Sequence, residues 1–276
     1  MQRALSTHLL AEHRLNTVWL DRIWSAGIPL VEIFCARQHF DYKNSAQVGE
    51  IAYWFGDSEL KLHSVHAPIF NDDCWGRSGP ASVIDITEIA KPKRINHVDE
   101  IKRAIEVAEK IQFRYLIQHL GVAGQEYDES RLEAAFNSLE ELSLFASHRG
   151  VKILLENIPS SICSAERLLH FVEQMHLDLG FCFDVGHANI MQGIEEAFSI
   201  MAPRVRSTHV HDNNGTDDRH LFPMAGAGGT VDWRKTMEML RSRGEQYPLL
   251  LELKDPGDKA NPLDAVREVF EKLENV

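Results

Sequence analysis

The sequence predicts an α/β fold, a (β/α)8 TIM barrel that forms a single domain over residues 1–276. Short apolar runs rich in β-branched residues alternate with longer segments of helical periodicity, and eight such pairs follow one another along the chain. Runs such as ILLE and LLLE are apolar on both faces, as in a parallel sheet that helices cover. Eight strand–helix units in 276 residues fit a closed barrel better than an open sheet.

Each expected strand is followed by an expected helix, and no linker or internal repeat divides the chain. The expected strands are residues 4–9, 30–35, 60–67, 115–120, 151–157, 180–184, 205–211 and 249–253. The expected helices are residues 17–26, 46–55, 97–111, 129–149, 165–175, 194–201, 233–243 and 262–273. Asp128 or Ser130, Ser164 and Asp232 are suitable N-caps, and Gly150 suits the position after a helix end.

Two segments are much longer than the roughly 2–6 residues that join a strand to a helix. Residues 67–96 contain Trp75, which is either a lid or pocket aromatic or a residue packed at the surface. Residues 207–233 carry three histidines together with aspartates and glycines. Imidazole and carboxylate groups are ligands for borderline and hard metal ions, so this second segment predicts a metal site.

The composition limits the classes of partner. The formal net charge of −12 weighs against nucleic acid, because phosphate contacts need clustered Lys and Arg. The N-terminus lacks the apolar core of a signal peptide, and no run of about 18 apolar residues indicates a membrane span. The four cysteines are scattered without a CxxC pair, which is typical of reduced thiols. We therefore expect a cytoplasmic protein that does not interact with a membrane.

A metal-binding, acid–base or anion-binding residue ends every expected strand, and the C-terminal ends of the strands form the active site of a TIM barrel. In chain order these residues are His8, Arg37 with His39, His66, His119, Glu156, Asp184 with His187, His209 with His211, and Glu252. A lone histidine after a strand is more often structural than functional, and this is the favoured interpretation for His8, His39 and His63. Arg37 and His39 are nevertheless retained, with Trp75, as candidates for substrate binding.

Glu156 and Glu252 each follow a run of leucines, so their carboxylates are expected in the mouth of the barrel above apolar packing. A buried carboxylate is costly unless a metal ion or a cationic side chain compensates it. With Asp184 and His209, the two glutamates would form a four-ligand site for one divalent ion. The alternative is pairing with Arg or Lys, for which Arg37 and Lys254 are the few candidates at strand ends.

Seven motifs resemble those of a known family. They are HAP at 66–68, QHLG at 118–121, ENIP at 156–159, DVGHAN at 184–189, HVHDN at 209–213, DRHL at 218–221 and LELK at 251–254. Over nearly its whole length the chain resembles the xylose isomerase-like TIM-barrel superfamily. That group contains sugar and sugar-phosphate isomerases and epimerases, and the endonuclease IV type of abasic-site DNA repair enzyme. The DxGHAN, HDN and DxH motifs are specific to the superfamily but not to one activity.

The resemblance implies two alternative ligand sets. Epimerase members imply one metal held by Glu156, Asp184, a histidine of the seventh strand and Glu252. Endonuclease IV members imply a cluster of three metals that also uses His66, His119, His187, Asp218 and His220. His209 fits the family pattern better than His211, which would then either contact the metal ligands from behind or face the substrate. One to three ions of Zn, Mn or Co per chain are expected. The family's PGxG loop often carries a glutamate, whereas here residues 223–229 keep the glycines without an acidic residue.

These observations predict a metal-dependent isomerase or epimerase of a small sugar or sugar phosphate that works through an enediolate. Glu156 and Glu252 would be the acid and base, while His187, Arg37 and His211 would hold hydroxyls or a phosphate. The alternatives are a phosphodiesterase of the endonuclease IV kind, a lyase or dehydratase with the same enolate chemistry, and a binding protein without catalysis. The oligomeric state is open, although barrels of this group often pair.

Overall fold

Eight parallel strands form one sheet in the computed structural model, which describes residues 1–226, 228–255, 257 and 261–276. The strands are β1 (Arg3–Ser6), β2 (Leu30–Phe34), β3 (Lys61–His66), β4 (Tyr115–His119), β5 (Lys152–Glu156), β6 (Gly180–Asp184), β7 (Val205–His209) and β8 (Leu249–Leu251). The hydrogen-bonded order runs from β7 back to β1 and then to β8. Val210 closes the ring, because its N–H donates to the carbonyl of Leu250 and its carbonyl accepts from Glu252.

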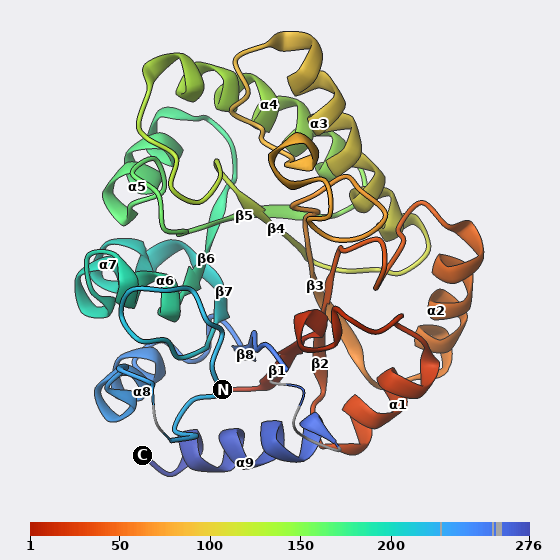
Figure 1. Ribbon diagram of the computed structural model, residues 1–276, viewed down its shortest axis with the longest axis vertical. Helices are drawn as coiled ribbons and strands as arrows, with labels where there is room; N and C mark the ends of the chain where they lie inside the picture. Colours follow the sequence, from red (N-terminus) through yellow and green to blue (C-terminus); the bar gives the residue numbers. More distant parts are fainter. Residues whose placement is uncertain (227, 256, 258–260) are drawn as a thin grey trace.

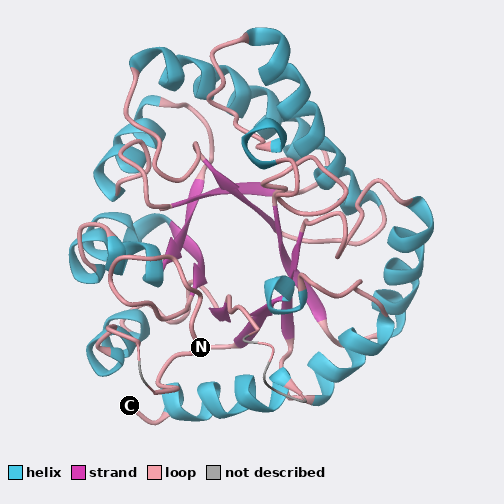
Figure 2. Cartoon of the chain, in the orientation of Figure 1, coloured by secondary structure: helices cyan, strands magenta, loops and turns pink. Residues whose placement is uncertain are grey.

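The helices form an outer ring around the strands (Figures 1 and 2). They are α1 (Thr17–Ser25), α2 (Ser45–Asp57), α3 (Lys91–Ile105), α4 (Glu129–Ser147), α5 (Ala165–Gln174), α6 (Val185–Ile190), α7 (Ile194–Met201), α8 (Trp233–Arg241) and α9 (Pro262–Glu274). Apolar side chains between the strands and the helices make up the main core, while a smaller cluster of Tyr115, Ile117, Leu154 and Cys182 fills the barrel interior. In the described part of the chain, no helix is long and apolar enough to cross a membrane.

The TIM barrel predicted from the sequence is confirmed, and every expected strand and helix is present. Asp128 rather than Ser130 caps α4, with its side chain accepting from the backbone N–H groups of residues 130 and 131. Two differences have local causes. α3 begins at Lys91 instead of residue 97, because Pro92 suits the first turn of a helix. The short helix α6 was not expected; Asp184 caps it by accepting from the backbone N–H of His187.

The long connection from β3 to α3 is tied to the neighbouring β4–α4 connection. Its backbone pairs Phe70 with Val83 in an antiparallel bridge. Further along, the Asp85 carboxylate accepts from Gln125 Nε2 at 3.0 Å and from Arg131 Nη1 at 3.2 Å. These contacts fix the loop against the C-terminal ends of the strands, where it forms one side of the cavity described below.

His39, which is buried in the turn after β2, makes the stability of the fold depend on pH. Desolvation lowers the pKa of His39 from 6.5 to about 4, so the unfolded chain takes up a proton that the folded state resists. The free energy of unfolding should therefore fall as the pH decreases from 6.5 to about 4. Replacing His39→Asn, whose amide can keep the hydrogen bond to the carbonyl of His13, should flatten this dependence by roughly 1.4 kcal/mol per pH unit in urea unfolding. Equal slopes for the two proteins would contradict this burial of His39.

Candidate metal centre and active-site cavity

The C-terminal ends of β3 to β8 and the loop after β7 bring together three groups of potential metal ligands. Group 1 is Glu156, Asp184, His209 and Glu252; group 2 is His66, His119 and Glu156; group 3 is His187, His211, Asp218 and His220. Within each group, one ligand atom from every residue lies within 4.8 Å of the others. All nine of the predicted metal ligands are therefore in one of these groups, and His211 joins them.

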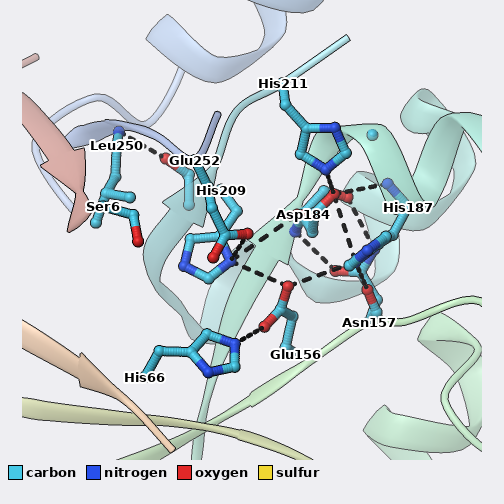
Figure 3. A network of polar contacts seen from close by, with 12 residues as sticks. Ser6, His66, Glu156, Asn157, Asp184, His187, His209, His211, Leu250 and Glu252 are labelled. Carbon is cyan, nitrogen blue, oxygen red and sulfur yellow. Dashed lines mark hydrogen bonds and ion pairs between the residues drawn. The ribbon is translucent and has the colours of Figure 1, made fainter. Parts of the chain in front are cut away.

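Group 1 is buried at the end of the barrel, with His209 at its centre (Figure 3). Nδ1 of His209 lies 3.0 Å from Oε1 of Glu156 and 3.3 Å from Oε2 of Glu252. Oδ2 of Asp184 lies 3.9 Å from the same nitrogen. These four side chains come from strands or strand ends far apart in sequence, and three of them are carboxylates that point at one small volume.

Two carboxylates connect group 1 to the other groups. The second oxygen of Glu156, Oε2, lies 3.2 Å from Nε2 of His119 and 3.4 Å from Nε2 of His66. The other oxygen of Asp184, Oδ1, lies 3.2 Å from Nε2 of His211. The three groups thus form one continuous polar surface, with Glu156 shared between groups 1 and 2.

The histidine rings are held in the tautomer and orientation that metal binding requires. Nδ1 of His66, of His187 and of His220 each lies 2.8–3.0 Å from a backbone carbonyl. A carbonyl only accepts, so these Nδ1 atoms carry the proton and Nε2 of the neutral ring is left to bind a ligand. His209 is held the other way round, because its Nε2 contacts a carboxylate and its Nδ1 faces group 1.

Unsatisfied polar atoms show that this donor set fits a divalent cation. Oδ2 of Asp184 is buried without a hydrogen bond, and buried Nε2 of His211 makes none of good geometry, although it lies 3.2 Å from Oδ1 of Asp184. Among the described residues, no Lys or Arg forms an ion pair with Glu156, Asp184 or Glu252. Carboxylate and imidazole ligands in such a buried cluster suit Zn, Mn or Co, and a cation would compensate the desolvated charges.

The histidines carry the compensating charge when they are protonated. Burial disfavours a charged His220, but its hydrogen bond with Asp218 and the nearby charges of Glu252, Asp218 and Asp184 together outweigh burial and raise the pKa of His220 to about 9. Burial likewise opposes ionisation of Glu156, yet the charge of His209 and the hydrogen bonds from His119 and His187 hold the pKa of Glu156 well below its usual range. A metal ion would replace these protons, so binding to this centre should release protons.

Glu32 belongs to the candidate centre but is not among the residues predicted from the sequence. It is fully buried on β2, and its carboxylate oxygens accept from Nε2 of His209 at 3.1 and 3.2 Å. The hydroxyl of Ser64 donates to the same carboxylate at 2.7 Å. The sequence does mark Glu32, because it is the single charged residue in the apolar run LVEIF. The search of strand ends does not find it, since it lies inside a strand.

A cavity of about 900 Å³ opens above the three groups. Trp75 and His187 line it, as predicted for substrate-binding residues, and so does His8, for which a structural role was favoured. Nδ1 of His8 bonds to the carbonyl of Leu253 at 3.0 Å, so this ring has both a structural bond and a surface in the cavity. His211 is fully buried and contacts the centre through Asp184.

Arg37 and His39 do not lie with the other substrate-binding candidates. The guanidinium of Arg37 pairs with Asp41 and Asp73 outside the cavity lining. His39 is fully buried, and its Nδ1 bonds to the carbonyl of His13. Both residues follow β2 in a turn that leads away from the strand end, which their position in the sequence did not reveal.

The model of the xylose isomerase-like TIM barrel family matches residues 20–276. The chain belongs to this family. A D-tagatose 3-epimerase-like protein has a similar structure, with a TM-score of 0.78 and 24% identity over 100% of this chain and 97% of that one. The IolI protein with a bound zinc atom has a TM-score of 0.74 and 19% identity over 99% and 96% of the two chains. The uncharacterized protein MJ1311 of Methanocaldococcus jannaschii is 29% identical over 185 residues, which span 63% of this chain and 62% of that protein.

Replacing Glu32→Gln tests whether the buried carboxylate supports His209 as a ligand. The glutamine can still accept from Nε2 of His209 but removes the negative charge that makes Nδ1 a stronger donor. We expect the affinity for Zn²⁺, measured by competition with a chelator, to fall about 10–100-fold. The exposed Glu50→Gln on α2 is the matched control and should bind Zn²⁺ like the wild type. Unchanged affinity in the folded Glu32→Gln protein would show that this carboxylate does not act on the metal centre.

Proposed function

We propose that the chain is a divalent-metal-dependent isomerase or epimerase of a small carbohydrate. The observation that carries this proposal is the convergence of the Glu156 and Glu252 carboxylates on His209 Nδ1, at 3.0 and 3.3 Å. Moving a proton at a carbon next to a carbonyl requires a base and an acid beside the same carbon, together with stabilisation of the enediolate. Group 1 supplies two such carboxylates at the inner end of a substrate-sized cavity.

Glu156, Asp184, His209 and Glu252 are the residues that would hold the ion. A bound divalent ion would polarise the substrate carbonyl and stabilise the negative charge that develops on its oxygen. Of the two glutamates, one would take the proton from the substrate carbon and the other would return a proton to it. His187 and His220 line the cavity and would orient substrate hydroxyls.

Glu156→Gln and Glu252→Gln test the assignment of the acid and base. With ketoses and Mn²⁺, Co²⁺ or Zn²⁺ in D₂O, the wild type should epimerise or isomerise its substrate and incorporate deuterium at the reacting carbon, which NMR detects. Each variant should lose roughly 10²–10⁴-fold in rate. Because both residues are also ligand candidates, the metal content of each variant is measured, and Glu50→Gln again serves as the control. A variant that retains both metal and full rate would remove its glutamate from the mechanism.

A phosphodiesterase of the endonuclease IV kind is the second candidate, and groups 2 and 3 favour it because they adjoin group 1 closely enough for several ions. The charge of the centre depends on occupancy. One divalent ion leaves the carboxylates of groups 1 and 3 in excess, which suits a neutral substrate, whereas three ions outweigh them and suit a phosphate. Lys254 is the one Lys or Arg among the described residues that line the cavity, which is little support for a polyanion.

Nicking of a DNA duplex that contains an abasic site separates the two candidates. We expect no cleavage above background with Zn²⁺, Mn²⁺ or Co²⁺, because the mouth of the cavity is acidic rather than basic. Metal-dependent nicking that Glu156→Gln abolishes, together with three ions per chain, would establish the phosphodiesterase instead.

A further inference from the structure

The cavity is larger than a small sugar bound at group 1 would need, and more of its lining is apolar than such a sugar would contact. Its volume of about 900 Å³ is near the upper end of the 300–1,000 Å³ that drug-sized ligands occupy. The metal-ligand groups form only part of its lining. The remainder comes from the connections after β1 and β3, the ends of β2, β4 and β5, and the segment after β8. Its greater part is apolar, although Glu12, His13, Lys254 and Asp255 also belong to it.

Aromatic rings form a continuous wall in this apolar part. The ring of Trp75 lies edge-on to Phe34 at 5.1 Å and to Phe70 at 6.1 Å between centroids. The same wall reaches the metal-ligand groups, because the Phe34 ring lies 5.0 Å from that of His66 and the His8 ring lies 4.7 Å from that of His220. A molecule bound at the metal-ligand groups would therefore extend directly along these rings.

Aliphatic side chains supply most of the remaining apolar lining, among them Val83, Ile84, Val122 and Ile158. Their side chains offer no partner for a hydroxyl, and a hydroxyl buried without a hydrogen bond costs roughly 1–3 kcal/mol in proteins. An anionic group is disfavoured as well, because the two carboxylates of Glu12 and Asp255 line the cavity against the single cation of Lys254. Trp75 and Gln118 also line the cavity, and their Nε1 and Oε1 atoms are buried without a hydrogen bond. Two such atoms do not satisfy the several hydroxyls of a second sugar, so this part of the cavity suits an uncharged, largely apolar group better than a second sugar or a phosphate.

We propose that the substrate is a carbohydrate that carries an apolar aglycone, an aryl or alkyl group, and a ketone on its sugar ring, with its sugar at the metal-ligand groups and its aglycone between the aromatic and aliphatic side chains. The ring ketone supplies the carbonyl of the enediolate, because the acetal carbon of a glycoside cannot. The inference rests on the proposed function for the position of the sugar. It adds the class of substrate, a glycoside-like conjugate rather than a free monosaccharide.

Calorimetric titration of the purified full chain tests this proposal with matched probes. Phenyl β-D-glucopyranoside is compared with methyl β-D-glucopyranoside, and the corresponding pairs of galactose and xylose follow. At least one phenyl glycoside should bind tenfold or more tightly than its methyl partner, and an octyl glycoside should share this preference. Cellobiose, which places a second sugar in the same position, should bind more weakly than the phenyl glucoside.

Val83→Asp places a charge in the apolar part of the cavity and should reduce the affinity of the phenyl glycoside at least tenfold. Val122→Asp repeats the test from the β4–α4 connection should the first variant fail to fold, which circular dichroism reports. Ile89→Asp is the matched control, because Ile89 is exposed on the same connection as Val83 but lies outside the cavity lining. It should bind the phenyl glycoside like the wild type.

Absence of any preference for the phenyl glycosides, including absence of binding in every pair, would overturn the proposed aglycone site. So would tighter binding of cellobiose. These outcomes are separate from failure of the proposed function, since titration does not need turnover. A clear phenyl preference in a protein that epimerises nothing would leave the apolar site in place and overturn the isomerase or epimerase, whereas rapid turnover of free ketoses without that preference would do the reverse.

Discussion

The structure depends on the electrostatic cost of placing three carboxylates around one histidine inside the end of a barrel. Glu156, Asp184 and Glu252 are almost completely buried, and the described Lys and Arg side chains form no ion pair with any of them. A divalent cation, or protons on the surrounding imidazoles, must therefore balance them. The barrel provides the rigidity that this requires, because each carboxylate lies at the end of, or directly after, a different strand whose position the ring of eight strands fixes.

The same constraint explains the polar atoms that lie behind the centre. Burying Glu32 and Ser64 in a barrel interior costs free energy. Ser64 donates to Glu32, and Glu32 accepts from Nε2 of His209, which fixes His209 with Nδ1 toward the carboxylates. Backbone carbonyls that accept from Nδ1 fix the orientation of the rings of His66, His187 and His220 in the same way. A centre held in this way before a substrate arrives needs little reorganisation during reaction, which is the property that electrostatic catalysis requires.

Much of this could be predicted from the sequence, because the barrel makes the positions of strand ends equivalent. Once ILLE and LLLE are recognised as strands, Glu156 and Glu252 must share a rim, and a search of each strand end finds the histidines and Asp184. Other features depend on three-dimensional detail. The direction of the turn after β2 removes Arg37 and His39 from the cavity, and the inward orientation of Glu32 depends on the register of β2. The apolar cavity arises from loops whose packing no local periodicity describes.

The most direct test of the account is anomalous X-ray diffraction at the absorption edge of the metal, from crystals of the protein grown with Zn²⁺ or Mn²⁺. We expect an anomalous peak between the ligand atoms of Glu156, Asp184, His209 and Glu252, about 2.0–2.2 Å from each. A crystal without a peak at that point, in which the carboxylates are balanced by protonated histidines alone at saturating metal, would contradict the central claim that this ring of side chains exists to hold a cation.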